Sequence, residues 1–261
     1  MSYTNILNIM DLSGIPLFFK ERGEEDPIIM FGGPCAYNVE PIADFADIVM
    51  IGEGEESLPE VMNIYSKYKG KSYPGMKNEF LLEVAINVKG AYVPSLYRAE
   101  YDKAGKFSSI APTHEGVPEK IQKRIIRKMD EVYFPEKILV PNIDVVHSRI
   151  MLELFRGCTR GCRFCQAGIV YRPIRERSKE KLLEIAEKLI RATGYEEVSL
   201  TSLSSSDYSK IEELLDELDE KYTCENLSLS LPSLRLDNFS IEMAEKVQKG
   251  TKKPVAKKET A

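Results

Sequence analysis

The chain has 261 residues, of which 43% are hydrophobic and 30% are charged, and this is enough to build the core of one or two domains. A formal net charge of −5 argues against a protein that coats nucleic acid through its overall charge. No apolar run reaches the length of a membrane helix, and the start MSYTNILNIM lacks the basic and apolar regions of a secretory signal. Five cysteines, three of them clustered, are not the pattern of a secreted disulfide framework, so we expect a cytoplasmic protein.

The N-terminal part of the chain alternates between helices and strands. A helix that ends at a glycine is predicted for YTNILNIMDL, and a short buried strand for PIIMF, which leads into a turn at Gly32 and Gly33. The next strand is predicted for ADIVMI, after which Ser57 and Glu60 form a capping box that opens another helix. This order indicates a parallel sheet flanked by helices, so we assign residues 1–84 to a doubly wound domain that is entered midway.

The middle of the chain differs in character. A hairpin is predicted for residues 97–111, where the sequence alternates on both sides of the turn signal DKAGK. A basic segment, EKIQKRIIRKMD, and an extended connection marked by prolines follow the hairpin. We therefore assign residues 85–147 to an ordered linker with a hairpin.

The C-terminal part alternates regularly again. Strands are predicted for IMLELF, EEVSLTSL and NLSLSLPSL, and helices are predicted to start at Ser178, Ser209 and Ser240. These three βα units are half of a six-unit barrel, so residues 148–249 should form an incomplete barrel and residues 250–261 a disordered, lysine-rich tail. An incomplete barrel exposes the edge of its third strand, so we expect marginal stability or a second chain that completes the barrel.

Three cysteines, Cys158, Cys162 and Cys165, lie within eight residues in the segment RGCTRGCRFCQAG, directly after the first of these strands. A cubane 4Fe-4S cluster takes one thiolate per iron, so three thiolates leave one iron with an open position, which is typical of a catalytic centre. A loop in this place lies at the C-terminal mouth of a βα barrel, where such folds keep their active sites. The alternative is a structural zinc site with Cys224 or a histidine as fourth ligand, but Cys35 and Cys224 are more simply packing residues.

The segment CTRGCRFC resembles the C-x3-C-x2-C signature of radical S-adenosylmethionine enzymes, including the aromatic residue before the third cysteine. The resemblance implies that the three cysteines hold a 4Fe-4S cluster and that Phe164 lies against the adenine of S-adenosylmethionine. It also implies reductive cleavage of this cofactor to methionine and a 5′-deoxyadenosyl radical, which abstracts hydrogen from a substrate. A reductant such as flavodoxin or ferredoxin would supply the electron.

Two further segments resemble parts of the same superfamily. The stretch TSLSSSD resembles the polar stretch of methylthiotransferase-like members, which implies that Ser202, Ser204 and Ser206 contact the methionine amino group; ordinary loop and cap serines are the alternative. The stretch LRLD, with Arg235 and Asp237, resembles an R-x-D of cobalamin-associated radical enzymes, and a surface ion pair is the alternative.

The N-terminal segment IMFGGPCAYNVEPIADFADIVMIGEGEE resembles the later half of a cobalamin-binding domain, which implies that Gly32 and Gly33 approach the nucleotide tail of cobalamin. A turn that requires small residues is the alternative. The D-x-H-x-x-G ligand motif is absent, since neither His114 nor His147 lies in that context, so weak or no cobalamin binding is expected. The resemblance covers residues 1–249 and points to a bacterial subfamily with no settled substrate.

The resemblance implies an α/β protein in which a partial Rossmann-like cobalamin-type domain precedes an incomplete radical barrel of about three βα units. The implied function is modification of an unknown substrate, including methyl or methylthio transfer. The alternatives are an inactive truncated remnant and a metal-binding interaction module. A cluster of arginines with one acid, Glu176, would suit an anionic cofactor or a nucleic-acid substrate, whereas a solvated basic loop is the plainer interpretation. These arginines are Arg156, Arg160, Arg163, Arg172, Arg175 and Arg177.

Overall fold

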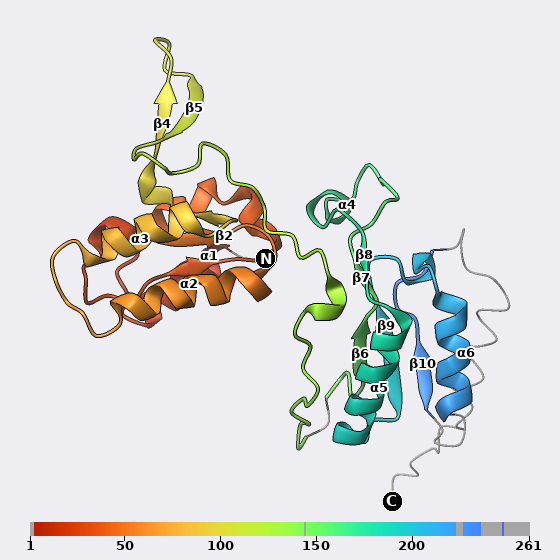
Figure 1. The fold of residues 1–261 in the computed structure, drawn as a ribbon. Helices are drawn as coiled ribbons and strands as arrows, with labels where there is room; N and C mark the ends of the chain where they lie inside the picture. The colour runs from red at the N-terminus through yellow and green to blue at the C-terminus, as the bar shows by residue number, and fades with distance from the viewer. Residues whose placement is uncertain (1–2, 144, 223–226, 236–246, 248–261) are drawn as a thin grey trace, which may run out of the picture. The chain divides into compact units, whose positions relative to one another are not determined.

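The computed structural model describes residues 3–143, 145–222, 227–235 and 247 (Figure 1). The chain divides into two compact units, Met1–Ile126 and Arg127–Ala261, which we call unit 1 and unit 2. Within the described residues, no helix combines the length and the apolar composition that crossing a membrane requires. Because the division falls after Ile126, residues 85–126 of the expected linker belong to unit 1 and residues 127–147 to unit 2.

Unit 1 is built around a three-stranded sheet in the order β1-β2-β3. Strands β1 (Met30–Phe31) and β2 (Ile48–Met50) are parallel, and β3 (Ala91–Tyr92) runs antiparallel to β2. All of β2 is buried, as predicted. The prediction of a buried first strand is wrong, because Met30 is 36% exposed.

Three helices belong to unit 1: α1 (Tyr3–Leu12), α2 (Gly54–Tyr68) and α3 (Met76–Asn87). Helix α1 is confirmed. Helix α2 has its N-cap at Glu53, four residues before the predicted cap Ser57. The Ser57 hydroxyl instead donates to the Glu53 carbonyl one turn back, at 2.9 Å. Helix α3 was not predicted, although four of its apolar residues, Phe80, Leu81, Val84 and Ala85, form one buried face.

The predicted hairpin is confirmed as β4 (Tyr97–Tyr101) and β5 (Phe107–Pro112), which pair antiparallel. Its turn is closed by the Asp102 carboxylate, which accepts hydrogen bonds from the N–H groups of Ala104 and Lys106 at 2.8 and 2.9 Å. Each unit also contains short 3-10 helices. Those of unit 1 are η1 (Phe19–Glu21), η2 (Pro34–Asn38), η3 (Glu40–Phe45) and η4 (Pro94–Leu96), and those of unit 2 are η5 (Met129–Glu131) and η6 (Ser205–Asp207).

After the hairpin the chain returns to the sheet of unit 1 and is fixed there by Arg124. The backbone of Arg124 forms a parallel bridge with Gly52, and its carbonyl accepts the Glu53 N–H at 3.2 Å. Its guanidinium donates to two carboxylates of α2, Glu56 and Glu60. Burial lowers the pKa of Arg124, but these hydrogen bonds outweigh burial and raise that pKa above its ordinary value.

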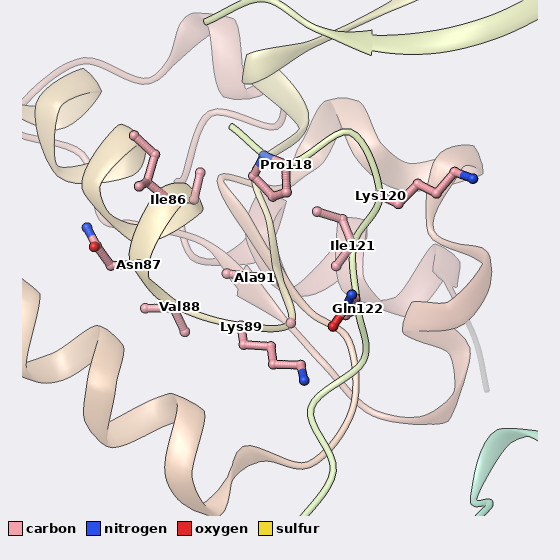
Figure 2. Close-up of a pocket in the computed structure, with 11 residues that line it drawn as sticks. Ile86, Asn87, Val88, Lys89, Ala91, Pro118, Lys120, Ile121 and Gln122 are labelled. Atoms are coloured by element: carbon pink, nitrogen blue, oxygen red, sulfur yellow. The ribbon is translucent and has the colours of Figure 1, made fainter. Parts of the chain in front are cut away.

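A cavity of about 260 Å³ lies in unit 1 between the C-terminal end of α3 and residues 118–122 (Figure 2). Ile121 points toward the cavity in this view and Lys120 points away from it. The residues that line it include none of the site candidates named from the sequence.

Unit 2 is built on a parallel sheet in the order β10-β9-β6 (Figure 1), formed by β6 (Ile150–Glu153), β9 (Glu197–Thr201) and β10 (Ser228–Ser230). The three predicted strands are thus confirmed, and the sheet is not closed into a barrel within the described residues. Across the sheet, Ile150 lies opposite Val198, which in turn lies opposite Leu229.

Two helices pack against this sheet, α5 (Lys179–Thr193) and α6 (Ile211–Tyr222), and their apolar residues form one core with the strands. Helix α5 confirms both predicted ends: the Ser178 hydroxyl accepts the Lys181 N–H, and Gly194 has φ +68°. Helix α6 starts at Ile211, one residue later than a cap at Ser209 predicts, and Ser209 instead donates its N–H and its hydroxyl to Glu176. The helix predicted from Ser240 and the predicted tail lie outside the described residues, as do Cys224 and Asp237.

The sheet of unit 2 has one apolar and one polar face. Ile150 and Leu152 are fully buried in the core with α5 and α6, while Met151, between them, is 55% exposed. In register with Met151 lie Ser199 and then Ser230, so this second face is lined largely by small polar side chains. The face opposite the helices is therefore suited to contact polar groups.

Candidate functional site

The three clustered cysteines lie on one closed loop at the carboxyl end of β6. Strands β7 (Phe155–Arg156) and β8 (Arg175–Glu176) pair antiparallel and so join the two ends of residues 157–174. The loop contains one helical turn, α4 (Ala167–Val170). Gly157 is required at its base, because it has φ +97° and a Cβ there would lie 2.5 Å from the Pro173 carbonyl oxygen. We call residues 157–174 the cysteine loop.

The thiols of Cys158, Cys162 and Cys165 are free and partly exposed. The Cys165 N–H donates to the Cys162 carbonyl at 3.0 Å, so these two cysteines bracket a turn. In the part of the chain that the structure describes, no three His, Cys, Asp or Glu side chains are already grouped to hold a metal. Three thiols on one loop fit a cubane cluster with one open iron by their chemistry, although they are not preassembled around it.

The loop after β9 is tied to the cysteine loop by an ion pair. Arg160 of the cysteine loop donates its Nε to Asp207 Oδ2 at 2.8 Å and a second guanidinium nitrogen to Asp207 Oδ1. Asp207 ends η6, which also carries the predicted serine Ser206. This pair was not identified from the sequence. The only signal for it in the sequence was that Arg160 and Asp207 each follow a predicted strand.

The three candidate serines differ in their hydrogen bonds. The Ser202 hydroxyl lies 3.1 Å from that of Ser205 and accepts the Ser204 N–H at 3.1 Å, so it stabilises the loop itself. The hydroxyls of Ser204 and Ser206 are buried, with residue exposures of 2% and 8%, and neither has a hydrogen-bond partner among the described residues. Buried hydroxyls without partners are costly, so these two are the better candidates to meet a ligand.

The loop after β10 also reaches the cysteine loop. Its Ser233 carbonyl accepts the Ser205 N–H at 2.8 Å, which joins it to the loop after β9. Two residues further on, Arg235 Nη1 lies 3.6 Å from Cys162 Sγ. Phe164 is 92% exposed on the cysteine loop, so its ring is accessible. The carboxyl ends of the three parallel strands thus bring the candidates of unit 2 to neighbouring loops.

Most arginines of residues 156–177 make contacts within unit 2. Arg156 pairs with Glu153, as does Arg177, which is only 1% exposed. Arg172 donates to the Cys158 carbonyl at 3.3 Å, and Arg175 donates to two carbonyls of the same loop. Arg163 is exposed. Much of the basic charge therefore holds the loop in place.

Arg177 is a buried residue that contacts several segments of unit 2, a role that sequence analysis did not identify. Its carbonyl accepts the Tyr208 hydroxyl at 2.8 Å, and its guanidinium lies over the Phe134 ring at 5.2 Å and donates to the Met129 carbonyl. Burial raises the pKa of Tyr208 to about 12, so this hydroxyl stays protonated and donates at neutral pH. Arg177 thus connects three segments of unit 2.

Gly32 and Gly33 lie in unit 1, directly after β1. Gly33 has φ +92°, which favours glycine, and a Cβ there would meet no atom within 4 Å. The turn accounts for Gly33, and the space beside it stays open.

The two histidines lie in exposed positions, and His114 Nδ1 shares a hydrogen bond of 2.9 Å with the Thr113 hydroxyl.

Comparison with known proteins identifies the class. A model of the N-terminal region of radical SAM proteins matches residues 1–94, and a model of the radical SAM superfamily matches residues 152–254. The chain therefore belongs to the radical SAM superfamily. It is 26% identical over 232 residues to the uncharacterized protein MJ0966 of Methanocaldococcus jannaschii, covering 85% of this chain and 41% of that protein. The chain thus spans about two fifths of the length of this relative.

Two solved structures are similar to this chain. The first is the cobalamin-dependent S-adenosylmethionine radical enzyme OxsB, with aqua-cobalamin and S-adenosylmethionine bound; it has a TM-score of 0.51 and 15% identity, over 95% of this chain and 32% of that chain. The second is the radical S-adenosylmethionine methyltransferase TsrM from Kitasatospora setae, with a TM-score of 0.46 and 15% identity, over 87% of this chain and 40% of that chain. The likeness to OxsB confirms the expected α/β fold class.

Proposed function

We propose that this chain forms the cluster-binding part of a radical SAM enzyme, in which Cys158, Cys162 and Cys165 hold a 4Fe-4S cluster. One observation carries the proposal: three free thiols lie on one loop at the carboxyl end of a parallel sheet, and contacts from Asp207 and Arg235 tie that loop to the two neighbouring strand ends. Membership of the superfamily supports the same assignment.

When bound, the cluster and S-adenosylmethionine supply a one-electron cleavage of the cofactor to methionine and a 5′-deoxyadenosyl radical. The chain's own residues bind and orient. Ser204 and Ser206 offer buried hydroxyls, without hydrogen-bond partners among the described residues, to the amino group of the methionine moiety. Phe164 offers an accessible ring for stacking against adenine, and Arg235 offers positive charge beside Cys162.

The reaction and the partners of this chain are more specific hypotheses than the binding of a cluster. Methyl or methylthio transfer rests on the likeness of TSLSSSD to the corresponding stretch of methylthiotransferase-like members. A flavodoxin or ferredoxin is the reductant we expect. A nucleic-acid substrate stays a prediction, although the contacts of Arg156, Arg160 and Arg177 with carboxylates reduce the charge available for it.

We infer weak or no cobalamin binding by this chain, because no histidine lies in a cobalamin-ligand motif. Gly32 and Gly33 remain the candidates for any contact with the nucleotide tail. Gel filtration with hydroxocobalamin, followed by absorption spectroscopy of the protein peak, tests this inference. Retention of one cobalamin per chain would show that it is wrong.

The function is tested by anaerobic reconstitution with iron and sulfide, followed by EPR of the dithionite-reduced protein. We expect about four irons per chain and a 4Fe-4S signal, lost in the triple alanine variant of Cys158, Cys162 and Cys165 and kept in Cys35→Ala, a free and partly buried cysteine of unit 1. Incubation with S-adenosylmethionine and dithionite should release 5′-deoxyadenosine. Iron binding without this product would favour a metal-binding interaction module, and equal iron in the triple variant would refute the cysteine assignment.

A further inference from the structure

Arg235, after β10, contacts a sulfur of the cysteine loop. Its Nη1 donates to Cys162 Sγ at 3.6 Å, across 73 residues of sequence. The loop that carries Arg235 is fixed upstream, where the Ser233 carbonyl accepts the Ser205 N–H at 2.8 Å. Arg235 itself is only partly exposed. A guanidinium in this place brings positive charge and an N–H donor to a sulfur that the proposed function assigns as a cluster ligand.

Among the described arginines of unit 2, Arg235 contacts a cysteine sulfur, whereas two arginines of residues 156–160 direct their guanidinium groups to carboxylates. Arg156 and Arg160 are paired with carboxylates, at 2.7 Å between Arg156 Nε and Glu153 and in a two-point contact between Arg160 and Asp207. Arg163 is exposed to solvent, which screens its charge.

Adding an electron to an iron–sulfur cluster makes the cluster more negative. Hydrogen bonds to its sulfurs and nearby positive charge stabilise the reduced form and so raise the reduction potential. We propose that Arg235 sets the reduction potential of the cluster through its contact with Cys162, as a positioning and charge-supplying residue. This inference rests on the proposed function, because it requires that Cys162 bind the cluster.

The test is an EPR-monitored redox titration of the reconstituted full chain with dithionite and mediators, without S-adenosylmethionine. We compare the parent protein with Arg235→Gln, Arg235→Lys and the control Arg163→Gln. Iron and acid-labile sulfide are measured for each, so that cluster content and potential are separate readouts. We expect Arg235→Gln to titrate at a lower potential with an unchanged content of iron. Arg235→Lys should fall between it and the parent, because lysine keeps the charge but not the planar fork of donors.

Arg163→Gln should titrate with the parent. Equal potentials for Arg235→Gln and the parent, at full iron content, would overturn the inference. Where Arg235→Gln assembles no cluster, Arg235→Lys decides: an assembled cluster of intermediate potential supports the role of charge, and loss of the cluster in both variants shows a purely structural role. Absence of a cluster from the parent itself would instead refute the proposed function, and this inference with it.

Discussion

Arg160 and Asp207 form a two-point ion pair between the cysteine loop and the turn η6, across 47 residues of sequence. Their side chains are 30% and 13% exposed, so the pair is shielded from solvent more than an ordinary surface pair. Two parallel hydrogen bonds fix the direction of the guanidinium as well as its position. The pair therefore restrains the cysteine loop before any cluster is present.

Replacing Asp207 with Asn tests this restraint. We expect amide hydrogen exchange over residues 157–168 of the apo protein to become about tenfold faster, since a shielded charged hydrogen bond contributes roughly 1–2 kcal/mol. Mass spectrometry of peptic peptides measures this exchange. Arg163→Gln is the matched control on the same loop. Unchanged exchange in Asp207→Asn would show that the pair does not restrain the loop.

Ser204 and Ser206, whose hydroxyls have no hydrogen-bond partner in the described part of the chain, should separate an effect on stability from an effect on cofactor binding. Ser204→Ala and Ser206→Ala should leave the free energy of unfolding unchanged or raise it slightly, because neither hydroxyl has a hydrogen bond to lose among the described residues and both are buried at a cost. Each should weaken binding of S-adenosylmethionine to the reconstituted protein by about tenfold, for the loss of one hydrogen bond to a charged group.

Ser205→Ala is the control for these variants, because the Ser205 hydroxyl donates to the carbonyl of Leu200 in β9 at 2.9 Å. It should destabilise the protein by about 1 kcal/mol. Denaturant unfolding and calorimetric titration with S-adenosylmethionine measure the two quantities. Unchanged cofactor affinity in both Ser204→Ala and Ser206→Ala would remove these serines from the proposed site.

Gly52 and Gly90 should tolerate no side chain. A Cβ at Gly52, which has φ +116°, would lie 2.3 Å from the Arg124 carbonyl oxygen, and one at Gly90 would lie 2.8 Å from the Ile51 carbonyl oxygen. We expect each alanine variant to lose roughly 3 kcal/mol or more, from backbone strain and the displaced Arg124. Gly54→Ala is the control, since a Cβ there meets nothing within 4 Å. Urea unfolding followed by circular dichroism measures the loss; equal stability of Gly52→Ala and Gly54→Ala would contradict the close approach.

Strand β10 lies at one end of the order β10-β9-β6 in the described part of unit 2, so it has one paired neighbour where β9 has two. We expect amides of Ser228–Ser230 to exchange faster than those of Glu197–Thr201 by at least an order of magnitude, because local opening needs fewer bonds to break. Exchange measured by mass spectrometry distinguishes the two strands. Equal protection would indicate that another segment or a second chain covers this edge.

Local signals in the sequence determined much of this protein. The stretch from Ser178 to Gly194 carries its own cap, apolar stripe and terminating glycine, and these act through neighbouring residues, so α5 was predictable at both ends. The spacing of Cys158, Cys162 and Cys165 likewise defines the cluster candidate within eight residues. The Ser57 and Ser209 assignments failed because each hydroxyl found another partner, the Glu53 carbonyl and Glu176.

Only the tertiary structure decided which distant residues meet at the cysteine loop. Asp207 and Arg235 follow different strands, 47 and 73 residues from their partners Arg160 and Cys162, and no spacing in the sequence relates them. The parallel register of β6, β9 and β10 brings their carboxyl ends to one edge, and that edge sets the contacts. Hydrogen bonds and charge pairs depend on distance in space, whereas the sequence patterns report only distance along the chain.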